Sequence, residues 1–243
     1  MLTAILLVVI LTAVLSFLKL PVVKGWFGEK ITSAGMWTFL DADKYRRIDN
    51  LIVPSLNGTT QIDHVLISAY GIFVLETKNM KGWIFGSPEN DKWTQSIYGK
   101  KRHFQNPMKQ NYRHVRCLMD YLHIEEKIFR PVVFFIGNCK FKTPMPSNVL
   151  NGGLIPYVQS FNIACLTTQQ VADIEGRLIA LRKDRSLTKQ VHLASLRDRH
   201  ESTTTCPRCG AELVRRVAKK GNSTGDPFLG CSTFPKCRFT RPV

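Results

Sequence analysis

The first 23 residues are the most apolar part of the chain. The run from Leu2 to Leu18 contains no charged residue and only three hydroxyl-bearing residues. With the apolar residues that follow Lys19, it approaches the roughly 20 residues that a helix needs to cross a bilayer. A core helix of that length would carry a polar face, so the pattern predicts a transmembrane helix over residues 1–23. A cleaved signal peptide is the alternative, but the basic start and the small-x-small cleavage site typical of one are not evident.

From residue 24 to residue 181, apolar and polar positions follow patterns typical of strands and of amphipathic helices. They predict strands over residues 44–54, 61–68, 72–79, 131–136 and 162–166, and helices over residues 28–40, 107–123 and from about residue 169. Asn57-Gly58 is a strong hairpin signal, and Thr167 and Gln170 have the spacing of a helix capping box. The order of helices and strands indicates a mixed α/β fold.

The charge of the chain narrows the choice of partners. The 243 residues include 34 Lys and Arg against 18 Asp and Glu, a formal net charge of +16. Such an excess indicates nucleic acid, an anionic lipid surface, or both as partners. With 44% hydrophobic residues the chain is not disordered, and seven cysteines are too few for a disulfide scaffold of this length. Cys117, Cys139 and Cys165 stand singly, as expected in a reducing compartment.

Four cysteines near the C-terminus have the spacing of a metal site. Cys206 and Cys209 form a Cys-x-x-Cys pair, and Cys231 and Cys237 follow it. Two close pairs are what a tetrahedral four-thiolate Zn²⁺ site requires. The alternatives are a redox pair, which would not need the second pair, and two disulfides, which the cytosol disfavours. Strands are predicted over residues 213–216 and 228–231. So small a module cannot build a real core, so we expect Zn²⁺ to supply much of its folding free energy.

Residues 206–243 closely resemble the four-cysteine zinc fingers at the C-termini of bacterial type IA topoisomerases, including the Gly-Cys-Ser-x-Phe-Pro-x-Cys ending. The resemblance implies binding of single-stranded DNA, in which basic side chains track phosphates and aromatic rings stack on bases. The predicted contacts are Arg215, Arg216, Lys219, Lys220, Lys236 and Arg238 for phosphates, and Phe228, Phe234 and Phe239 for bases. We expect at least one of these phenylalanines to belong to a small core around the metal instead.

The candidate chemistry lies on two neighbouring predicted strands. Asp63 is on the first, and Glu76 and Lys78 share one face of the second because side chains alternate along a strand. If the turn is tight, with Ser68 opposite Gly71, Asp63 lies opposite Glu76 with Cβ atoms about 4.5–5.5 Å apart. Two carboxylates and an ammonium would be costly there unless a cation is shared, which predicts a divalent-metal site. A bulge at Gly71 would instead bring the histidine after Asp63 opposite Glu76.

The wider pattern resembles the nuclease-related domain, NERD, among the restriction-endonuclease-like nucleases, whose motif is an acidic residue followed by Glu-x-Lys on the next strand. The matching pieces within residues 25–125 are Gly28-Glu29, Gly58-Thr-Thr-Gln-Ile-Asp63-His-Val, Gly71-Ile-Phe-Val-Leu-Glu76-Thr-Lys78-Asn, Gly82-Trp83-Ile-Phe-Gly86 and Gln105-Asn-Pro107-x-x-Gln110. The resemblance implies a restriction-endonuclease-like mixed sheet flanked by helices.

The same resemblance implies roles for individual positions. The implied catalytic residues are Glu29, Asp63, Glu76, Lys78 and Gln110. Asp63 and Glu76 would ligate Mg²⁺ or Mn²⁺, with the carbonyl of Thr77 as a further ligand, and the lysine would orient the attacking water. Glu29 would support the metal, or it is a partner of the helix dipole. Gln110 would contact substrate or water, or it is a solvated helix residue.

A basic segment from Lys92 to Arg116 contains seven Lys and Arg and no acidic residue. The interleaved aromatic residues are Trp93, Tyr98, Phe104 and Tyr112. The segment predicts a loop and a helix face that contact nucleic-acid phosphates. The predicted DNA contacts are Lys100, Lys101, Arg102, Lys109 and Arg113. The alternative is a solvated surface that faces anionic lipid. We expect His103 and His114 to be polar surface residues rather than metal ligands.

These features predict four parts. A transmembrane anchor over residues 1–23 precedes a nuclease-like domain over residues 24–181, with its core motifs in 25–140. A basic helix and linker over residues 182–205 then leads to the zinc finger over residues 206–243.

The predicted function is that of a membrane-anchored, Mg²⁺-dependent nuclease that hydrolyses DNA phosphodiester bonds. Lys19 and Lys24 follow the apolar run and no basic residue precedes it. The positive-inside rule then predicts a single-pass protein of a bacterial inner membrane, with its other domains in the cytoplasm. The alternative is a non-catalytic tether or adaptor with a degenerate nuclease fold, which holds DNA or a DNA-processing protein complex at the membrane.

Overall fold

The computed structural model describes residues 40–55, 58–207, 211–219, 224–235 and 237–243. Described residues 40–51 and 62–178 form one compact unit, and those of 52–61 and 179–243 form another. Among the residues described, no helix is both long and apolar enough to cross a membrane. The anchor predicted over residues 1–23, and all but the last residue of the helix predicted over 28–40, lie outside the described residues.

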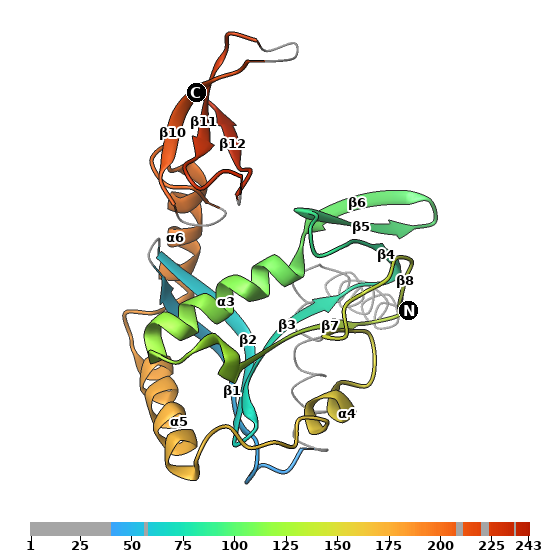
Figure 1. Cartoon of the computed structure of the whole chain (residues 1–243), viewed down its shortest axis with the longest axis vertical. Helices are drawn as coiled ribbons and strands as arrows, with labels where there is room; N and C mark the ends of the chain where they lie inside the picture. Colours follow the sequence, from blue (N-terminus) through green and yellow to red (C-terminus); the bar gives the residue numbers. More distant parts are fainter. Residues whose placement is uncertain (1–39, 56–57, 208–210, 220–223, 236) are drawn as a thin grey trace, which may run out of the picture. The chain divides into compact units, whose positions relative to one another are not determined.

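Strands and helices follow one another in mixed order along the chain (Figure 1). The strands are β1 (Arg46–Ser55), β2 (Gly58–Ser68), β3 (Gly71–Asn79), β4 (Gly82–Phe85), β5 (Lys92–Ile97), β6 (Lys100–Gln105), β7 (Phe129–Ile136), β8 (Cys139–Phe141), β9 (Val149–Leu150), β10 (Leu213–Val217), β11 (Pro227–Cys231) and β12 (Thr240–Pro242). The helices are α3 (Pro107–Leu122), the 3₁₀ helix η1 (Glu126–Ile128), α4 (Leu154–Gln159), α5 (Thr168–Lys183) and α6 (Lys189–Glu201). The predicted mixed α/β class is confirmed.

A five-stranded sheet in the order β1-β2-β3-β7-β9 carries the candidate site. β2 and β3 are antiparallel with Ser68 opposite Gly71, so the tight-turn register is confirmed and the bulged one is wrong. Gly71 has a φ of +129°, and a Cβ there would lie 2.6 Å from the carbonyl oxygen of Ile128, so a side chain has no room at this turn. β3 and β7 are parallel, and α3 lies in the crossover between them.

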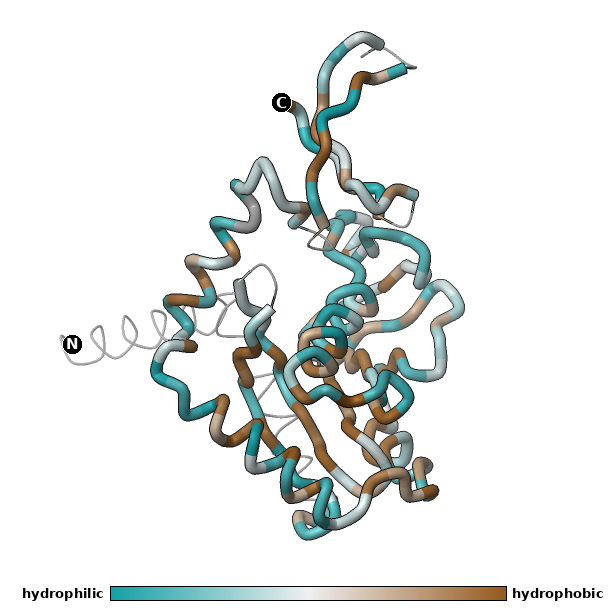
Figure 2. Tube along the Cα trace, turned by 60° about the vertical axis from the view of Figure 1, so that its left-hand side comes forward, coloured by the Kyte–Doolittle hydropathy of each residue, from teal (hydrophilic) through white to brown (hydrophobic). Residues whose placement is uncertain are grey.

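Both faces of the central sheet are covered. α3 packs against β3 and β7 on one face. On the other face, Leu154 and Val158 of α4 belong to the same buried cluster as Phe73 and Leu75 of β3. As a result β3 is buried from Gly71 to Glu76, and Figure 2 shows continuous hydrophobic stretches along the strands in its centre. Burial on both faces is typical of strands in parallel pairs, so a polar side chain at the end of such a strand has little access to water.

The predicted phosphate-contacting loop of the basic segment is instead a β-hairpin. β5 and β6 pair through a two-residue turn, Tyr98-Gly99, with positive φ at both residues. With β4 and β8 they form a four-stranded sheet in the order β6-β5-β4-β8. Trp93 is 1% exposed and stacks on Phe135 with ring centroids 6.1 Å apart, so this residue is core rather than a DNA contact. Phe104 joins the same cluster.

The N-terminus of α5 has the predicted capping box. The Thr167 amide donates to Gln170 Oε1 at 2.8 Å, and the Gln170 amide donates to Thr167 Oγ1 at 3.2 Å. The strand predicted over residues 162–166 just before it is wrong. The segment is irregular, and the amides of Cys165 and Leu166 both donate to the carbonyl of Ala69, at 2.8 and 3.0 Å. Ala69 lies in the turn between β2 and β3, so its carbonyl is available to these donors.

The second unit contains α6 and a three-stranded antiparallel sheet in the order β10-β11-β12. The strands predicted over residues 213–216 and 228–231 are confirmed as β10 and β11. α6 begins after Thr188, whose hydroxyl accepts the Val191 amide at 3.2 Å. In the same unit, Thr59 Oγ1 lies 2.8 Å from His192 Nδ1 and 2.9 Å from Ser195 Oγ. These bonds hold the hairpin end of β1 and β2 on α6.

Candidate active site and zinc centre

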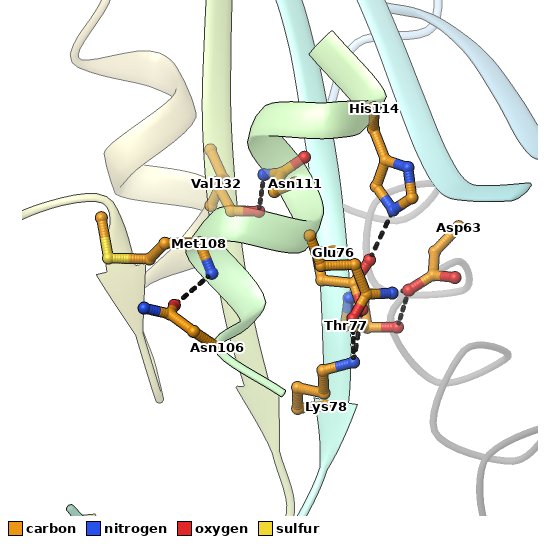
Figure 3. A network of polar contacts seen from close by, with 10 residues as sticks. Asp63, Glu76, Thr77, Lys78, Asn106, Met108, Asn111, His114 and Val132 are labelled. Carbon is orange, nitrogen blue, oxygen red and sulfur yellow. Dashed lines mark hydrogen bonds and ion pairs between the residues drawn. The ribbon is translucent and has the colours of Figure 1, made fainter. Parts of the chain in front are cut away.

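Asp63, Glu76 and Lys78 lie on the face of the central sheet that α3 covers (Figure 3). The β2–β3 ladder runs as far as the pair His64–Leu75, so Asp63 and Glu76 occupy the next position along both strands. His64 points to the opposite face, where its Nδ1 lies 2.9 Å from Asp49 Oδ1. The register therefore separates the two acidic residues from the histidine that a bulge would have brought to Glu76.

Glu76 is the centre of a buried polar network. Its carboxylate is 2% exposed; Oε1 accepts from Lys78 Nζ at 2.5 Å and Oε2 accepts from His114 Nε2 at 3.0 Å. Lys78 Nζ also donates to Gln110 Oε1 at 3.0 Å. Gln110 and His114 are four residues apart on α3 and thus share one side of the helix. Four of the five predicted catalytic residues therefore lie in or beside this network. The fifth, Glu29, lies outside the described residues.

Thr77 holds the carboxylate of Asp63. Its amide donates to Asp63 Oδ2 at 2.7 Å and its hydroxyl donates to the same oxygen at 2.8 Å. Burial raises the pKa of Asp63 above its usual value and the negative charge of Glu76 raises it further, although the two bonds from Thr77 act in the opposite direction. Thr77 supports the site through its donors, a role distinct from the carbonyl ligand that the resemblance implied.

The pKa of Glu76 is shifted in the opposite direction from that of Asp63. Burial by itself would raise the pKa of Glu76, but the positive charge of Lys78 and the hydrogen bond from His114 outweigh it, so the pKa lies below its usual value. The trio then carries two carboxylates against one ammonium. A negative charge is left uncompensated whenever both acids are ionised, and carboxylate oxygens are the ligands that Mg²⁺ prefers. The donor set fits a divalent cation.

Two asparagines of the α3 region fix the helix on the sheet. Asn111 Nδ2 donates to the carbonyls of Val74 on β3 and Val132 on β7, at 2.9 and 3.0 Å. Pro131 has no N–H to contribute to the β3–β7 ladder at this position, and the Asn111 amide supplies donors beside it.

At the helix start, Asn106 Oδ1 accepts the Met108 amide at 2.9 Å (Figure 3). Both asparagines thereby set the position of Gln110 and His114.

The prediction of a surface position for His114 is wrong. Its side chain is 3% exposed because it donates to the buried Glu76. Its spacing of four residues from Gln110 was the signal that could have placed it beside the same strand. His103 is exposed, as predicted, with its Nδ1 3.0 Å from Thr94 Oγ1. Asn111 carried no signal in the sequence, because its partners are backbone carbonyls of distant strands.

The predicted DNA contacts of the basic segment differ in their surroundings. Lys100, Lys101 and Arg102 are exposed on β6. Lys109 forms an ion pair with Asp91 at 2.9 Å and donates to the carbonyl of Glu89 at 2.8 Å, so part of its capacity is used within the chain. Arg113 is half-buried on α3. The exposed cations therefore concentrate on the β5–β6 hairpin rather than on the helix.

Three cysteines gather in the C-terminal sheet. The sulfurs of Cys206, Cys231 and Cys237 all lie within 4.8 Å of one another, and those of Cys206 and Cys237 are 3.8 Å apart. Thiolates around a tetrahedral Zn²⁺, with Zn–S near 2.3 Å, are about 3.8 Å apart. None of the six cysteines within the described ranges is in a disulfide, and Cys209 lies outside those ranges. The cluster supports a structural Zn²⁺ and argues against the redox and disulfide alternatives.

The side chains of the finger divide between core and surface. Phe239 packs on the cysteine cluster, so the expectation that one of the three phenylalanines is core is confirmed. Phe234 is 56% exposed with the guanidinium of Arg216 5.8 Å from its ring centroid. Phe228 is half-buried. The exposed basic residues are Arg215, Lys219 and Arg238, whereas Lys220 and Lys236 lie outside the described residues.

Comparison with protein families divides the chain in the same way, into a segment with the network around Glu76 and a C-terminal segment with the cysteine cluster. Residues 24–136 match the model of the nuclease-related domain. This chain carries a nuclease-related domain. Residues 203–243 match the topoisomerase DNA binding C4 zinc finger. The nuclease-related domain is therefore joined to a zinc finger of a DNA-binding type, and the network around Glu76 lies within the nuclease-related domain.

Several curated proteins share parts of the chain. An uncharacterized protein of Bacillus anthracis is 46% identical over 99 residues, which are 40% of this chain and 46% of that protein. The uncharacterized protein YrdD of Escherichia coli (strain K12) is 54% identical over 39 residues, 16% of this chain and 19% of that protein. DNA topoisomerase 1 of Mycoplasmoides gallisepticum is 53% identical over 34 residues, 14% of this chain and 4% of that protein. The chain thus spans less than half the length of each. No solved structure matches the chain.

Proposed function

We propose that this chain is a membrane-anchored, metal-dependent nuclease that hydrolyses phosphodiester bonds of DNA. The observation that carries the proposal is the buried network in which Glu76, Asp63 and Lys78 meet under α3 of the nuclease-related domain. Hydrolysis of a phosphodiester needs oxygen ligands for a divalent cation and positive charge near the attacking water. The trio supplies both kinds of group.

Each residue of the network has a distinct task in this proposal. Asp63 and Glu76 would hold Mg²⁺ or Mn²⁺, which would polarise the phosphate and lower the pKa of a water molecule. Thr77 holds Asp63 through two hydrogen bonds to Oδ2 and so orients the carboxylate that would bind the cation. Lys78 orients the attacking water and stabilises the charge that develops on the phosphate. Gln110 keeps the ammonium of Lys78 at the site through their 3.0 Å hydrogen bond.

The zinc finger supports DNA as the substrate. Its family is described as DNA binding, and the segment carries eight Lys and Arg against two Asp and Glu. Thiolates bound to Zn²⁺ offset part of this charge, yet exposed Arg215 and Arg238 remain on the surface. The finger holds single-stranded DNA while the nuclease-related domain cuts it.

The N-terminal apolar run anchors the enzyme in this proposal. Lys19 and Lys24 then keep the nuclease-related domain and the finger in the cytoplasm. A C-terminal fusion to alkaline phosphatase, expressed in bacteria, tests this topology. We expect the fusion to sediment with membranes and to be inactive, and an active fusion would contradict the orientation.

The enzymatic test uses the purified full-length chain, supercoiled plasmid and oligonucleotide substrates, with Mg²⁺, with Mn²⁺ and with no added divalent cation. Added metal is compared with no added metal because a chelator would also remove Zn²⁺. Lys78→Met should lower the cleavage rate by about 10²-fold or more. Lys127→Met is the matched control, because Lys127 is an exposed lysine of η1, paired with Glu125.

One observation favours a second candidate, a non-catalytic tether. Both oxygens of Glu76 already accept hydrogen bonds, from Lys78 and His114, as they would in a purely structural ion pair. The tether predicts salt-sensitive DNA binding without cleavage in any metal. Cleavage that needs added metal and is lost in Lys78→Met but kept in Lys127→Met excludes the tether, and cleavage equal in both variants excludes the proposed site.

A further inference from the structure

The four-stranded sheet has a row of side chains that crosses all its strands. Trp83 of β4 is paired with Ser96 of β5 on one side and with Lys140 of β8 on the other, and Ser96 is paired with Lys101 of β6. Directly paired residues project from the same face of a sheet. Lys101, Ser96, Trp83 and Lys140 therefore share one face, in this order across the sheet.

This face is the outer one, with Trp83, Lys101 and Lys140 exposed and Ser96, between them, 9% exposed. Ile84, Trp93 and Cys139 project from the opposite face and belong to a buried cluster with Phe135. Trp83, in contrast, is 51% exposed, and the ammonium of Lys142 lies 4.5 Å from its ring centroid. A large aromatic side chain thus stays half in water in the middle of a sheet, where an apolar partner or ligand could cover it.

The charge on this sheet has one sign. The four strands contain Lys92, Lys100, Lys101, Arg102 and Lys140, and no Asp or Glu. The nearest acidic residues in sequence lie in the β4–β5 loop. They are Glu89 and Asp91, and Asp91 is paired with Lys109 at 2.9 Å. An exposed aromatic ring between lysines, with no carboxylate in the strands, is complementary to a chain of phosphates that carries bases.

We infer that the outer face of this sheet binds single-stranded DNA, with a base stacked on Trp83 and phosphates held by Lys101, Lys140 and Lys142. Stacking platforms between basic side chains are the usual way in which proteins hold single strands. The inference rests on the proposed function in taking single-stranded DNA as the ligand, and it adds a second binding surface besides the finger.

Duplex DNA fits this face poorly. Four strands spaced about 4.8 Å apart give a surface at least ~14 Å wide between the outer backbones. The major groove is about 12 Å wide and admits a helix or a two-stranded ribbon. In a duplex, moreover, each base is covered by its neighbours, so none is free to stack on Trp83.

The face lies close to the nuclease-like network along the chain. Trp83 follows Lys78 by five residues, a length of chain that spans at most about 18 Å. A strand stacked on Trp83 therefore passes within a few nucleotides of the network.

Tryptophan fluorescence tests the inference at the residue concerned. The chain has four tryptophans; Trp93 is buried, and Trp26 and Trp37 lie outside the described residues. Oligothymidylate is added to the full-length Zn²⁺-loaded chain without Mg²⁺. We expect quenching of the emission, loss of that quenching in Trp83→Phe, and a weaker interaction, by about 10-fold, in a Lys101→Glu, Lys140→Glu double variant, since affinity falls with each phosphate that is no longer neutralised.

Matched controls distinguish DNA binding at this face from a general effect of the protein's charge. The Lys127→Glu, Lys183→Glu double variant makes the same charge change at exposed positions off the sheet, and Ile163→Ala removes an exposed apolar side chain elsewhere. Both should keep the wild-type titration.

Three results would overturn the inference. They are equal quenching in Trp83→Phe, equal quenching by a duplex of the same length, and a response to phosphatidylglycerol vesicles with none to oligothymidylate. Because Mg²⁺ is absent, the result does not depend on cleavage. A failed cleavage assay would leave this surface standing, and a failed titration would leave the nuclease proposal standing.

Discussion

Residue by residue, the candidate site depends on how Glu76 is kept ionised inside the fold. A carboxylate taken out of water is costly unless charged and hydrogen-bonded partners replace the solvent. Lys78 and His114 are those partners, one on each oxygen. His114 is thus a positioning residue. It holds Oε2 and so directs Oε1 toward Lys78.

His114→Ala should weaken both stability and cleavage. The substitution leaves Glu76 Oε2 buried without its donor, and this lowers the free energy of unfolding by about 1–3 kcal/mol. Cleavage should fall about 10-fold or more in kcat, with little change in KM for DNA, because His114 acts through Glu76. Thermal melts and steady-state cleavage measure the two effects.

His103→Ala is the matched control, because His103 is exposed on β6. Its melting temperature and kcat should stay close to those of the wild type. Equal losses in the two histidine variants would contradict the role given to His114.

Asp63→Asn should stabilise the protein in the absence of added divalent metal. Because the pKa of Asp63 is raised in the folded chain, its contribution to stability is complete below the unfolded pKa of about 3.9 and is lost as the pH rises through the folded-state pKa. Asparagine carries no charge to bury, and its side-chain oxygen can still accept from Thr77. Its melting temperature should exceed that of the wild type by a few degrees near neutral pH.

The difference between Asp63→Asn and the wild type should shrink as the pH falls toward 4, and added Mg²⁺ should raise the wild-type melting temperature more than that of the variant. Thermal melts across this pH range are the measurement. A variant that melts below the wild type at neutral pH would show that Asp63 is compensated within the fold.

Single residues also mark what the sequence could and could not predict. Glu76 and Lys78 were placed on one face because strand alternation is strictly local. His114 was not, since its burial comes from a strand that lies 38 positions earlier in the chain. The helical pattern showed only that His114 is polar and lies four residues from Gln110. The packing of α3 on β3 turns this side of the helix inward.

Among the elements, α3 matters most for the site. It carries Gln110 and His114 to the end of β3, and Asn111 fixes it through two backbone carbonyls of different strands. An amide between two parallel strands holds the helix in one register. A helix that slid by one residue would move both side chains away from Glu76 and Lys78.

Asn111→Ala should therefore lower activity as well as stability. Two buried carbonyls lose a donor, at a cost of about 1–3 kcal/mol. The melting temperature should fall, and cleavage should fall further than the fraction unfolded explains. Asn148→Ala is the control, because the half-buried Asn148 donates to one β7 carbonyl, Pro131 O at 3.0 Å, in a hydrogen bond at the surface. Similar cleavage rates in both variants would contradict the positioning role of α3.

For the elements, the sequence predicted structure correctly where that structure depends on residues close together in the chain. The Thr167–Gln170 capping box follows from cap chemistry over a few residues. The β2–β3 turn left two registers open in the sequence, and the structure has the tight one. The β5–β6 hairpin was missed because Lys100 to His103 shows no alternation of polarity, both sides being polar. Trp93 was misplaced for the same reason, since its burial depends on Phe135 of a strand far along the chain.

Across the whole molecule, positive charge is concentrated on two parts of the chain. One is the zinc finger and the other is the four-stranded sheet of the nuclease-related domain. Neither surface holds the buried network, so binding and cleavage should be separable by mutation. The family comparisons support this separation, because the two matched segments do not overlap.

Loss of the finger's Zn²⁺ should reduce DNA affinity without changing kcat. In a Cys206→Ser, Cys231→Ser variant we expect one Zn²⁺ fewer per chain and about 10-fold weaker binding. The dependence of log affinity on log salt should become less steep by about 0.7 for each phosphate that the finger no longer binds. Cys165→Ser, which changes an exposed cysteine outside the cluster, should leave all three quantities unchanged. A lower kcat at saturating DNA in the zinc-site variant would contradict the division of labour.

The most direct test of the central claim is the rate at which end-labelled DNA is cleaved in Mg²⁺ by the wild type and by Asp63→Asn. The variant is suited to this test because, without added divalent metal, it is expected to be at least as stable as the wild type. It is therefore expected to be folded in the assay, and a lost rate cannot be ascribed to unfolding. We predict Mg²⁺-dependent cleavage by the wild type and a rate at least about 10²-fold lower in Asp63→Asn. Equal rates in the two proteins, or no cleavage by the wild type in any divalent metal, would contradict a nuclease site at Asp63, Glu76 and Lys78.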